Sequence, residues 1–118
     1  MNLQPIVSIG MPLFNEGQFL RQTLDSLVAQ DYQNIEIVIS DNASTDDTKS
    51  ICAEYQERFP YIRYQRFCEN KGAGENFAFV LREAKGTYFM WGCGHDMWSS
   101  NYISECVNTL LKYPESVI

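Results

Sequence analysis

The sequence predicts an α/β fold in which a mostly parallel sheet is flanked by helices. Short apolar runs alternate with segments of helical periodicity, which is typical of parallel strands joined by right-handed crossovers. Polar residues cluster directly after each apolar run, where an open parallel sheet binds its ligand. The chain has 118 residues, enough for one domain with a modest core, so we expect a single domain over 1–118.

The first strand is expected at Ile6–Met11, where apolar residues predominate until Pro12 ends the run. The segment 14–17 is a predicted loop. A helical pattern follows, and its expected core stripe consists of Phe19, Leu20, Leu24, Leu27 and Val28.

The second strand is expected at Ile35–Ser40, which is rich in β-branched residues. It leads into Asp41–Asp46, a segment dense in turn and helix-capping residues. We expect Ser44 or Thr45, with help from Asp46, to cap a helix that ends near Arg58. Ile51, Cys52 and Tyr55 supply its apolar side.

The alternating segment 61–66 predicts a strand at a sheet edge. After a glycine-rich loop at 70–74, a helix is expected over 76–85, with Gly86 as the residue that ends it. Its predicted core stripe is Phe77, Val80, Leu81 and Ala84.

The run 87–91 predicts a buried strand, and 101–113 predicts a last helix with an apolar side. Pro114 stops this helix, and Val117–Ile118 has the character of a further strand. We therefore expect the chain to be part of a longer protein.

Composition narrows the classes of partner. The net charge is −6 and no Lys/Arg cluster stands out, so nucleic acid is not expected to bind. The four cysteines are scattered, which favours reduced thiols. Neither a secretory signal nor a membrane-spanning run is visible in the sequence, so we expect a cytoplasmic location. A longer protein that contains this chain could associate with the membrane at its cytoplasmic face.

Four segments carry a resemblance: Val7–Glu16, Ile37–Asp46, Asn70–Gly72 with Asn76, and Gly86–Trp98. Together they resemble the N-terminal half of a family-2 nucleotide-sugar glycosyltransferase, in the order and spacing of that family. The resemblance implies a Rossmann-like fold of the GT-A type. It also implies a full enzyme that transfers sugar from a nucleotide diphosphate, typically a UDP-sugar, to a hydroxyl acceptor such as a glycan, with inversion, in polysaccharide synthesis.

The resemblance also assigns nucleotide-binding residues. Phe14 would lie against the base, Glu16 would lie near the nucleoside, and Asp41 would accept a hydrogen bond from the uracil N–H. The remaining residues of this expected pocket are Pro12, Asn70, Lys71, Gly72 and Asn76. The family's general base is a carboxylate from the second half of the domain, so we expect it outside this chain and the chain alone to be inactive.

The expected metal site departs from the family pattern. Relatives carry Asp-x-Asp after the fourth strand and hold Mn²⁺ or Mg²⁺ there, whereas this chain has Cys93-Gly94-His95-Asp96. Two alternatives follow. Either His95 and Asp96 hold a divalent cation with help from the diphosphate, or His95 meets the phosphates directly.

Structural roles compete with these functional ones. Asp41 could serve as a turn residue, Glu16 as a solvated first-turn acid and His95 as a hydrogen-bonded structural histidine. The altered 93–96 motif also favours an alternative function, a non-catalytic nucleotide-binding or interaction module of the same fold. An incomplete domain could leave a sheet edge uncovered, which favours homo-oligomers.

Overall fold

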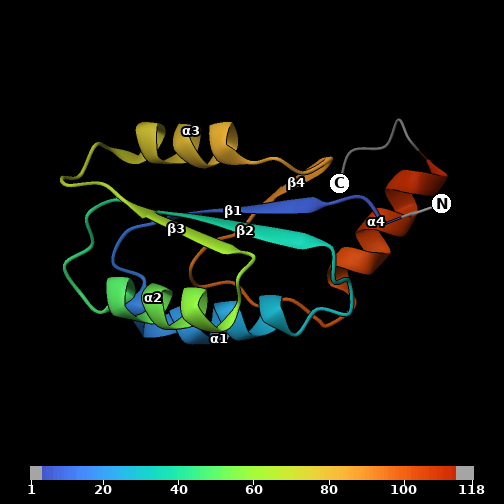
Figure 1. Cartoon of the computed structure of the whole chain (residues 1–118), viewed down its shortest axis with the longest axis horizontal. Coiled ribbons are helices and arrows are strands. Elements are labelled where there is room, and N and C mark those ends of the chain that lie inside the picture. The colour runs from blue at the N-terminus through green and yellow to red at the C-terminus, as the bar shows by residue number, and fades with distance from the viewer. Residues whose placement is uncertain (1–3, 114–118) are drawn as a thin grey trace.

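The computed structural model describes residues 4–113, and it confirms the predicted alternation of strands and helices (Figure 1). The elements are β1 (Val7–Leu13), α1 (Gly17–Val28), β2 (Ile35–Asp41), α2 (Thr48–Arg58), β3 (Ile62–Arg66), α3 (Ala73–Glu83), β4 (Tyr88–Trp91) and α4 (Tyr102–Lys112).

The four strands form one sheet in the order β3-β2-β1-β4, and every neighbouring pair is parallel. The chain first winds from β1 through β2 to β3 and then returns to the other side of β1 to form β4. This reversal of direction lies between β1 and β4, and open α/β sheets bind their ligands in the crevice at such a point.

The helices cover both faces of the sheet. Figure 1 shows α1 and α2 on one face and α3 on the other. Helix α4 lies toward one end of the sheet. Gln30, just after α1, joins α1 to the start of α4: the Gln30 side-chain Nε2 donates to the Ser99 carbonyl, and its Oε1 accepts the Ile103 N–H. The result is a three-layer arrangement, as the sequence predicted.

The main core lies between the sheet and the α1–α2 layer. Alternate residues of β1 and β2 point into it, and Leu20, Leu24 and Leu27 of α1 pack against them. On the opposite face, α3 packs closely on β1 at Gly10. A Cβ there would lie 2.6 Å from Phe89 Cζ and 3.1 Å from Val80 Cγ2, so glycine permits the close approach.

Pro12 does not end the first strand, contrary to the sequence prediction. Strand β1 continues to Leu13, and Pro12 pairs in register with Ser40. The Gly10 carbonyl faces β4, where it accepts the Gly92 N–H at 2.9 Å. Pro12, two residues further, has the same orientation but lies beyond the last β1–β4 pair, so its missing N–H leaves no strand partner unsatisfied.

Two expected helix stripes are wrong in part. Phe19, Phe77 and Leu81 were expected in the core, yet they are exposed, whereas Leu24 and Val80 are fully buried. Helix α3 also begins at Ala73 rather than Asn76, so Gly74 belongs to the helix rather than to the preceding loop.

Two predictions near β4 are corrected. Gly86 does not end α3 in a left-handed conformation; it is required because a Cβ would lie 2.6 Å from Ser8 Oγ and 2.7 Å from the Ile6 carbonyl. Strand β4 is half-buried rather than buried, since it is an edge strand of the described sheet. The expectations for Pro114 and Val117–Ile118 lie outside the described residues.

Candidate functional site

A cavity of about 360 Å³ lies at the carboxyl ends of β1 and β4, beside the first turn of α3. It occupies the crevice that the strand order predicts. Six of the residues expected to bind a nucleotide or a metal line it: Pro12, Phe14, Glu16, Asn70, Asn76 and His95. Four others, Asp41, Lys71, Gly72 and Asp96, are not part of its lining.

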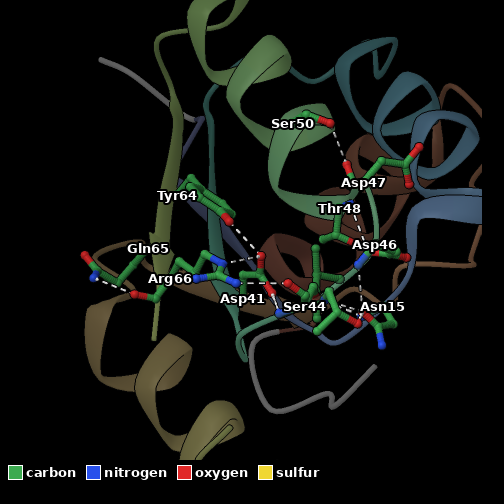
Figure 2. Close-up of polar contacts among 12 residues, drawn as sticks. Asn15, Asp41, Ser44, Asp46, Asp47, Thr48, Ser50, Tyr64, Gln65 and Arg66 are labelled. Carbon is green, nitrogen blue, oxygen red and sulfur yellow. Dashed lines mark hydrogen bonds and ion pairs between the residues drawn. The ribbon is translucent and has the colours of Figure 1, made fainter. Parts of the chain in front are cut away.

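Asn15 joins the loop after β1 to the loop after β2. Its Oδ1 accepts the backbone N–H groups of Thr45 at 2.8 Å and Asp46 at 3.3 Å, and its own N–H donates to Ser44 Oγ at 2.9 Å (Figure 2). Asn15 has a positive φ of 51°, which asparagine tolerates better than most residues. The two loops therefore form one rigid edge of the site.

Asp46 strengthens this edge and supports the start of α2. Its carboxylate accepts the N–H groups of Thr48 at 2.9 Å and Gly17 at 3.0 Å. Partial burial raises the pKa of Asp46, but these hydrogen bonds outweigh burial and hold it below its usual value. The helix begins at Thr48 with Asp47 as its N-cap residue, so the predicted caps Ser44 and Thr45 are wrong. Asp46 is not the cap residue either, but its carboxylate accepts the N–H of the first helical residue from one position before the cap.

Asn42 joins the loop after β2 to the glycine-rich segment. Its Nδ2 donates to Asn70 Oδ1 at 3.0 Å and to the Gly72 carbonyl at 3.2 Å, and its Oδ1 accepts the Lys71 N–H at 2.8 Å. Gly72 has a φ of 88°, a backbone conformation that favours glycine. Lys71 directs its ammonium over the Phe67 ring, 4.8 Å from the centroid.

Asp41 is completely buried beneath this edge. Its Oδ1 accepts the Ser44 N–H at 2.9 Å, and its Oδ2 accepts the Tyr64 hydroxyl at 2.6 Å, with Arg66 Nε at 3.7 Å (Figure 2). Burial and the hydrogen bond to Asp41 raise the pKa of Tyr64. The contact between Asp41 and a uracil base that the resemblance implies stays a prediction.

Aromatic side chains form one wall of the cavity. Phe77 and Trp91 line it with ring centroids 5.1 Å apart, and Phe89, outside the lining, packs edge-on against Trp91 at 4.8 Å. Together with Phe14, the Phe77 and Trp91 rings offer flat apolar surfaces of the kind that take a nucleobase. The sequence predicted Phe77 in the core of its helix and Trp91 in a buried strand; the position of Trp91 directly before Gly92 at a strand end was the available signal.

The segment that departs from Asp-x-Asp contributes Cys93, Gly94 and His95 to the cavity lining. His95 Nδ1 is 3.4 Å from Glu16 Oε2, and Asp96 Oδ2 accepts the Cys93 N–H at 3.2 Å. Burial and the neighbouring Asp96 raise the pKa of Cys93. Gly94 lies against Glu16, where a Cβ would be 2.6 Å from Glu16 Cγ.

These side chains do not fit a preformed cation site. Within residues 4–113, no three His, Cys, Asp or Glu side chains gather as a metal-binding group. Cys93 and His95 replace both expected acids, and a hard oxygen-preferring cation would find one carboxylate, Asp96, in the motif itself.

A second cavity of about 340 Å³ adjoins the first and shares Glu16 and His95 with it. Its other lining residues are Asn15, Gln18 and Phe19. The exposure of Phe19, which was expected in the core, follows from this position at the start of α1. Across residues 4–113, no helix has the length and apolar character needed to cross a bilayer.

Comparison with known proteins gives a consistent result. The model of the family described as "Glycosyl transferase family 2" matches residues 8–118. An uncharacterized glycosyltransferase of Rickettsia typhi is 34% identical over 108 residues, which cover 92% of this chain and 33% of that protein. An uncharacterized Mycobacterium tuberculosis protein is 34% identical over 116 residues, covering 96% and 33%.

Solved structures share the fold. The Pyrobaculum calidifontis mannosyltransferase PcManGT, in complex with GDP-Man and Mn²⁺, has a TM-score of 0.83 and 27% identity over 91% of this chain and 32% of that one. Staphylococcus aureus TarS in complex with UDP has a TM-score of 0.85 and 22% identity, covering 92% and 32%. The chain thus spans about a third of the length of these relatives.

Proposed function

The chain belongs to glycosyl transferase family 2, and we propose that it is the donor-binding part of a glycosyltransferase. The complete protein would transfer a sugar from a nucleotide diphosphate, of the UDP type, to a hydroxyl acceptor such as a glycan, with inversion. The observation that carries this proposal is the cavity between the β1, β3–α3 and β4 loops, which collects aromatic and amide side chains at the reversal point of the sheet.

The rest of the catalytic machinery is assigned to the remainder of a longer protein. The chain spans a third or less of the length of the curated relatives it matches. A general base must reach the acceptor hydroxyl, and we place that base and the acceptor site outside residues 1–118. On this proposal the chain binds a nucleotide but does not transfer sugar by itself.

Within the cavity, the base would lie between Phe14 and the Phe77–Trp91 pair, whose rings supply stacking surfaces. Pro12 and Glu16 would border the nucleoside. The loop held by Asn42 would bring Asn70 into the lining, with Lys71 and Gly72 behind it.

For the diphosphate, we place His95 in direct contact with the phosphate oxygens. The absence of a gathered metal-binding group among the described residues supports this arrangement over a cation held chiefly by the protein. Because PcManGT has been solved with GDP-Man and Mn²⁺, whether this chain needs a cation to bind a nucleotide is the part of the proposal that most requires a test. A non-catalytic nucleotide-binding module is the second candidate, and the exchange of both expected acids for Cys93 and His95 favours it.

Calorimetric titration with UDP tests the nucleotide site. Phe14 and Phe19 are matched variants, because both are exposed, 46% and 43%, and lie on neighbouring segments but line different cavities. Phe14→Ala is expected to weaken UDP binding by about 1–3 kcal/mol, the usual contribution of stacking on one base. Phe19→Ala should leave it unchanged; equal loss in both variants would contradict the proposed location.

Homo-oligomers stay a prediction of this proposal. Strand β4 is an edge of the described sheet, and its last residue, Trp91, is 44% exposed. Light scattering with size-exclusion chromatography checks this, and a clean monomer would exclude it.

A further inference from the structure

The two edge strands of the described sheet, β3 and β4, differ in chemistry. Strand β3 carries Arg63, Gln65 and Arg66, and charged side chains on an edge strand oppose pairing with a further strand. Strand β4 consists of Tyr-Phe-Met-Trp and contains neither a charged residue nor a proline. Of the two edges, β4 is therefore the one whose sequence permits another strand to pair with it.

The backbone of β4 presents hydrogen-bonding groups on its outer side. Gly92, directly after β4, donates its N–H to the Gly10 carbonyl of β1 at 2.9 Å. Because backbone groups of successive residues point to opposite sides of a strand, the N–H and C=O groups of Phe89 and Trp91 face away from β1. Within residues 4–113, the sheet has no strand on that side of β4. A further strand laid there would complete a ladder of hydrogen bonds.

Large apolar side chains lie exposed on the α3 face of this edge. Phe77 and Leu81 of α3 are 44% and 54% exposed, and Trp91 of β4 is 44% exposed. Leu81 follows Phe77 by one helical turn, so both lie on one side of α3, and the Phe77 ring contacts the Trp91 ring. We call Phe77, Leu81 and Trp91 the β4 surface. Contiguous exposed apolar groups of this kind mark a protein interface.

The other face of β4 is apolar as well. A narrow cavity of about 60 Å³ lies between β4 and α4, and the α4 residues that line it are Tyr102, Ile103, Cys106 and Leu110. Successive side chains of a strand point to opposite faces of its sheet. A strand paired with β4 would place one set of side chains against the β4 surface and the other set beside α4.

We propose that the outer edge of β4 pairs with a β-strand from the part of the longer protein beyond residue 118, and that apolar side chains of this strand cover the β4 surface. This inference rests on the part of the proposed function that makes the chain one portion of a longer protein. The chain covers 33% of the Rickettsia typhi relative, so about two thirds of a protein of that length lies outside it. A second copy offers only the same four-residue strand, whereas the longer protein has the length to supply a strand and the elements that cover it.

Pairing at this edge also brings the rest of the protein to the nucleotide cavity. Phe77 and Trp91 belong both to the β4 surface and to the cavity lining, whereas Leu81 lies outside the lining. The added strand therefore borders the cavity beside β4. Leu81 is the position at which the strand contact can be changed without altering the cavity lining.

Hydrogen–deuterium exchange resolved to single amides tests this pairing. The 118-residue chain is compared with the complete protein, expressed from its full coding sequence, and both are measured without nucleotide. The Phe89 and Trp91 amides should exchange at least about a hundredfold more slowly in the complete protein. The Gly92 amide, which bonds to Gly10, should be protected in both. Since no nucleotide is present, a failure of UDP to bind would contradict the proposed function and leave this result unaffected.

Leu81→Lys and Leu111→Lys form a matched pair of variants. Both leucines are exposed on helices, 54% and 44%, but Leu111 lines a cavity at the amino ends of β1 and β4. Leu81→Lys should lower the thermal midpoint of the complete protein by at least about 3 °C and change that of the isolated chain by less than about 1 °C. Leu111→Lys should shift the midpoints of the two proteins alike.

Four results would overturn the proposal. The first is equal exchange of the Phe89 and Trp91 amides in the complete protein and in the chain, measured where light scattering shows the chain to be a monomer. The second is protection in the complete protein that is lost on dilution, which would assign the edge to a second copy. The third is an equal midpoint shift from Leu81→Lys in both proteins, and the fourth is a coding sequence that ends at residue 118.

Discussion

Asn15 Oδ1 accepts the backbone N–H of Thr45 at 2.8 Å, and this bond joins two loops that are 30 residues apart in the chain. The loops follow adjacent parallel strands, β1 and β2, so their starting points are fixed side by side by the sheet. Asn15 converts that proximity into a rigid edge, because Ser44 and Asp46 bond to the same residue. The position of Phe14, one residue earlier, depends on it.

Substitution of Asn15 should therefore weaken both the fold and nucleotide binding. Asn15→Gly removes the acceptor but keeps the left-handed backbone, and we expect a loss of about 1–3 kcal/mol in the free energy of unfolding. Asn15→Ala should lower the free energy of unfolding by about 1–2 kcal/mol more than Asn15→Gly, because alanine disfavours the positive φ at this position. Chemical denaturation measures both. Equal stability of the alanine and glycine variants would show that the backbone conformation contributes nothing.

Glu36 makes the free energy of unfolding depend on pH in the acidic range. Burial raises the pKa of Glu36, but hydrogen bonds from Ser8, the Lys85 N–H and Arg63 outweigh it and hold the pKa below its usual value. The network ties the segment between α3 and β4 to β1 and β2. A carboxylate whose pKa is lowered by folding contributes stability above its unfolded pKa, about 4.3, and loses it as pH falls further.

Glu36→Gln should thus be less stable than wild type at neutral pH, and the difference should shrink as pH falls from about 5 through the folded pKa. Urea denaturation of both proteins at several pH values measures it. Ser8→Ala removes one of the donors that lower the Glu36 pKa, so this variant should lose stability at a higher pH than the wild type does. A difference between Glu36→Gln and wild type that stays constant with pH would contradict this role.

The parallel sheet flanked by helices could be predicted from the sequence because each strand and helix has its own local pattern, and alternation then restricts the sheet to parallel crossovers. The order of the strands in the sheet was not predicted. The same rule placed the polar loops at one edge, and six of the expected residues do line the cavity. Which helix residues would be buried was less predictable. Phe19 and Phe77 fit their helical stripes, yet both line cavities at the ends of the strands.

Side-chain direction at a strand end also could not be predicted. The position of Asp41 at the end of β2 indicated a residue at the ligand edge. Its carboxylate accepts the Tyr64 hydroxyl and lies 3.7 Å from Arg66 Nε, and both of these β3 residues are more than twenty residues away in sequence. Contacts of that kind depend on register between strands, which the hydrophobic pattern of one strand does not reveal. The contact of Asp41 with a base stays a prediction.

His95 makes the cation requirement testable. With no gathered metal-binding group in residues 4–113, UDP binding to the wild-type chain should change little on addition of Mn²⁺. His95→Asp places a second carboxylate next to Asp96 and should gain Mn²⁺-dependent binding, because carboxylates suit this cation. Calorimetry with and without Mn²⁺ measures both, and His95→Ala separates the loss of imidazole from the gain of the acid. A wild-type chain that binds UDP only with Mn²⁺ would contradict the direct contact between His95 and phosphate.

Gly94, which lines the larger cavity, and Gly74, which does not, offer a matched pair of glycine substitutions. A Cβ on Gly94 would lie 2.6 Å from Glu16 Cγ, 2.7 Å from Glu16 Cβ and 2.9 Å from Leu13 Cδ2, whereas a Cβ on Gly74 meets nothing within 4 Å. Gly94→Ala must therefore push Glu16 and the 93–96 loop apart, which alters the shared wall of the two cavities. We expect weaker UDP binding and an unfolding free energy lower by about 1–3 kcal/mol, the usual cost of overpacking.

Gly74→Ala should do the opposite to stability. Gly74 lies in the first turn of α3 with open space around its Cα, so alanine should raise the unfolding free energy by about 0.4–1 kcal/mol. UDP affinity should stay unchanged, because Gly74 is not part of the cavity lining. Denaturation and calorimetry on both variants give the comparison. If Gly74→Ala weakened UDP binding and Gly94→Ala left UDP binding unchanged, the nucleotide would lie over the start of α3 and away from the 93–96 loop.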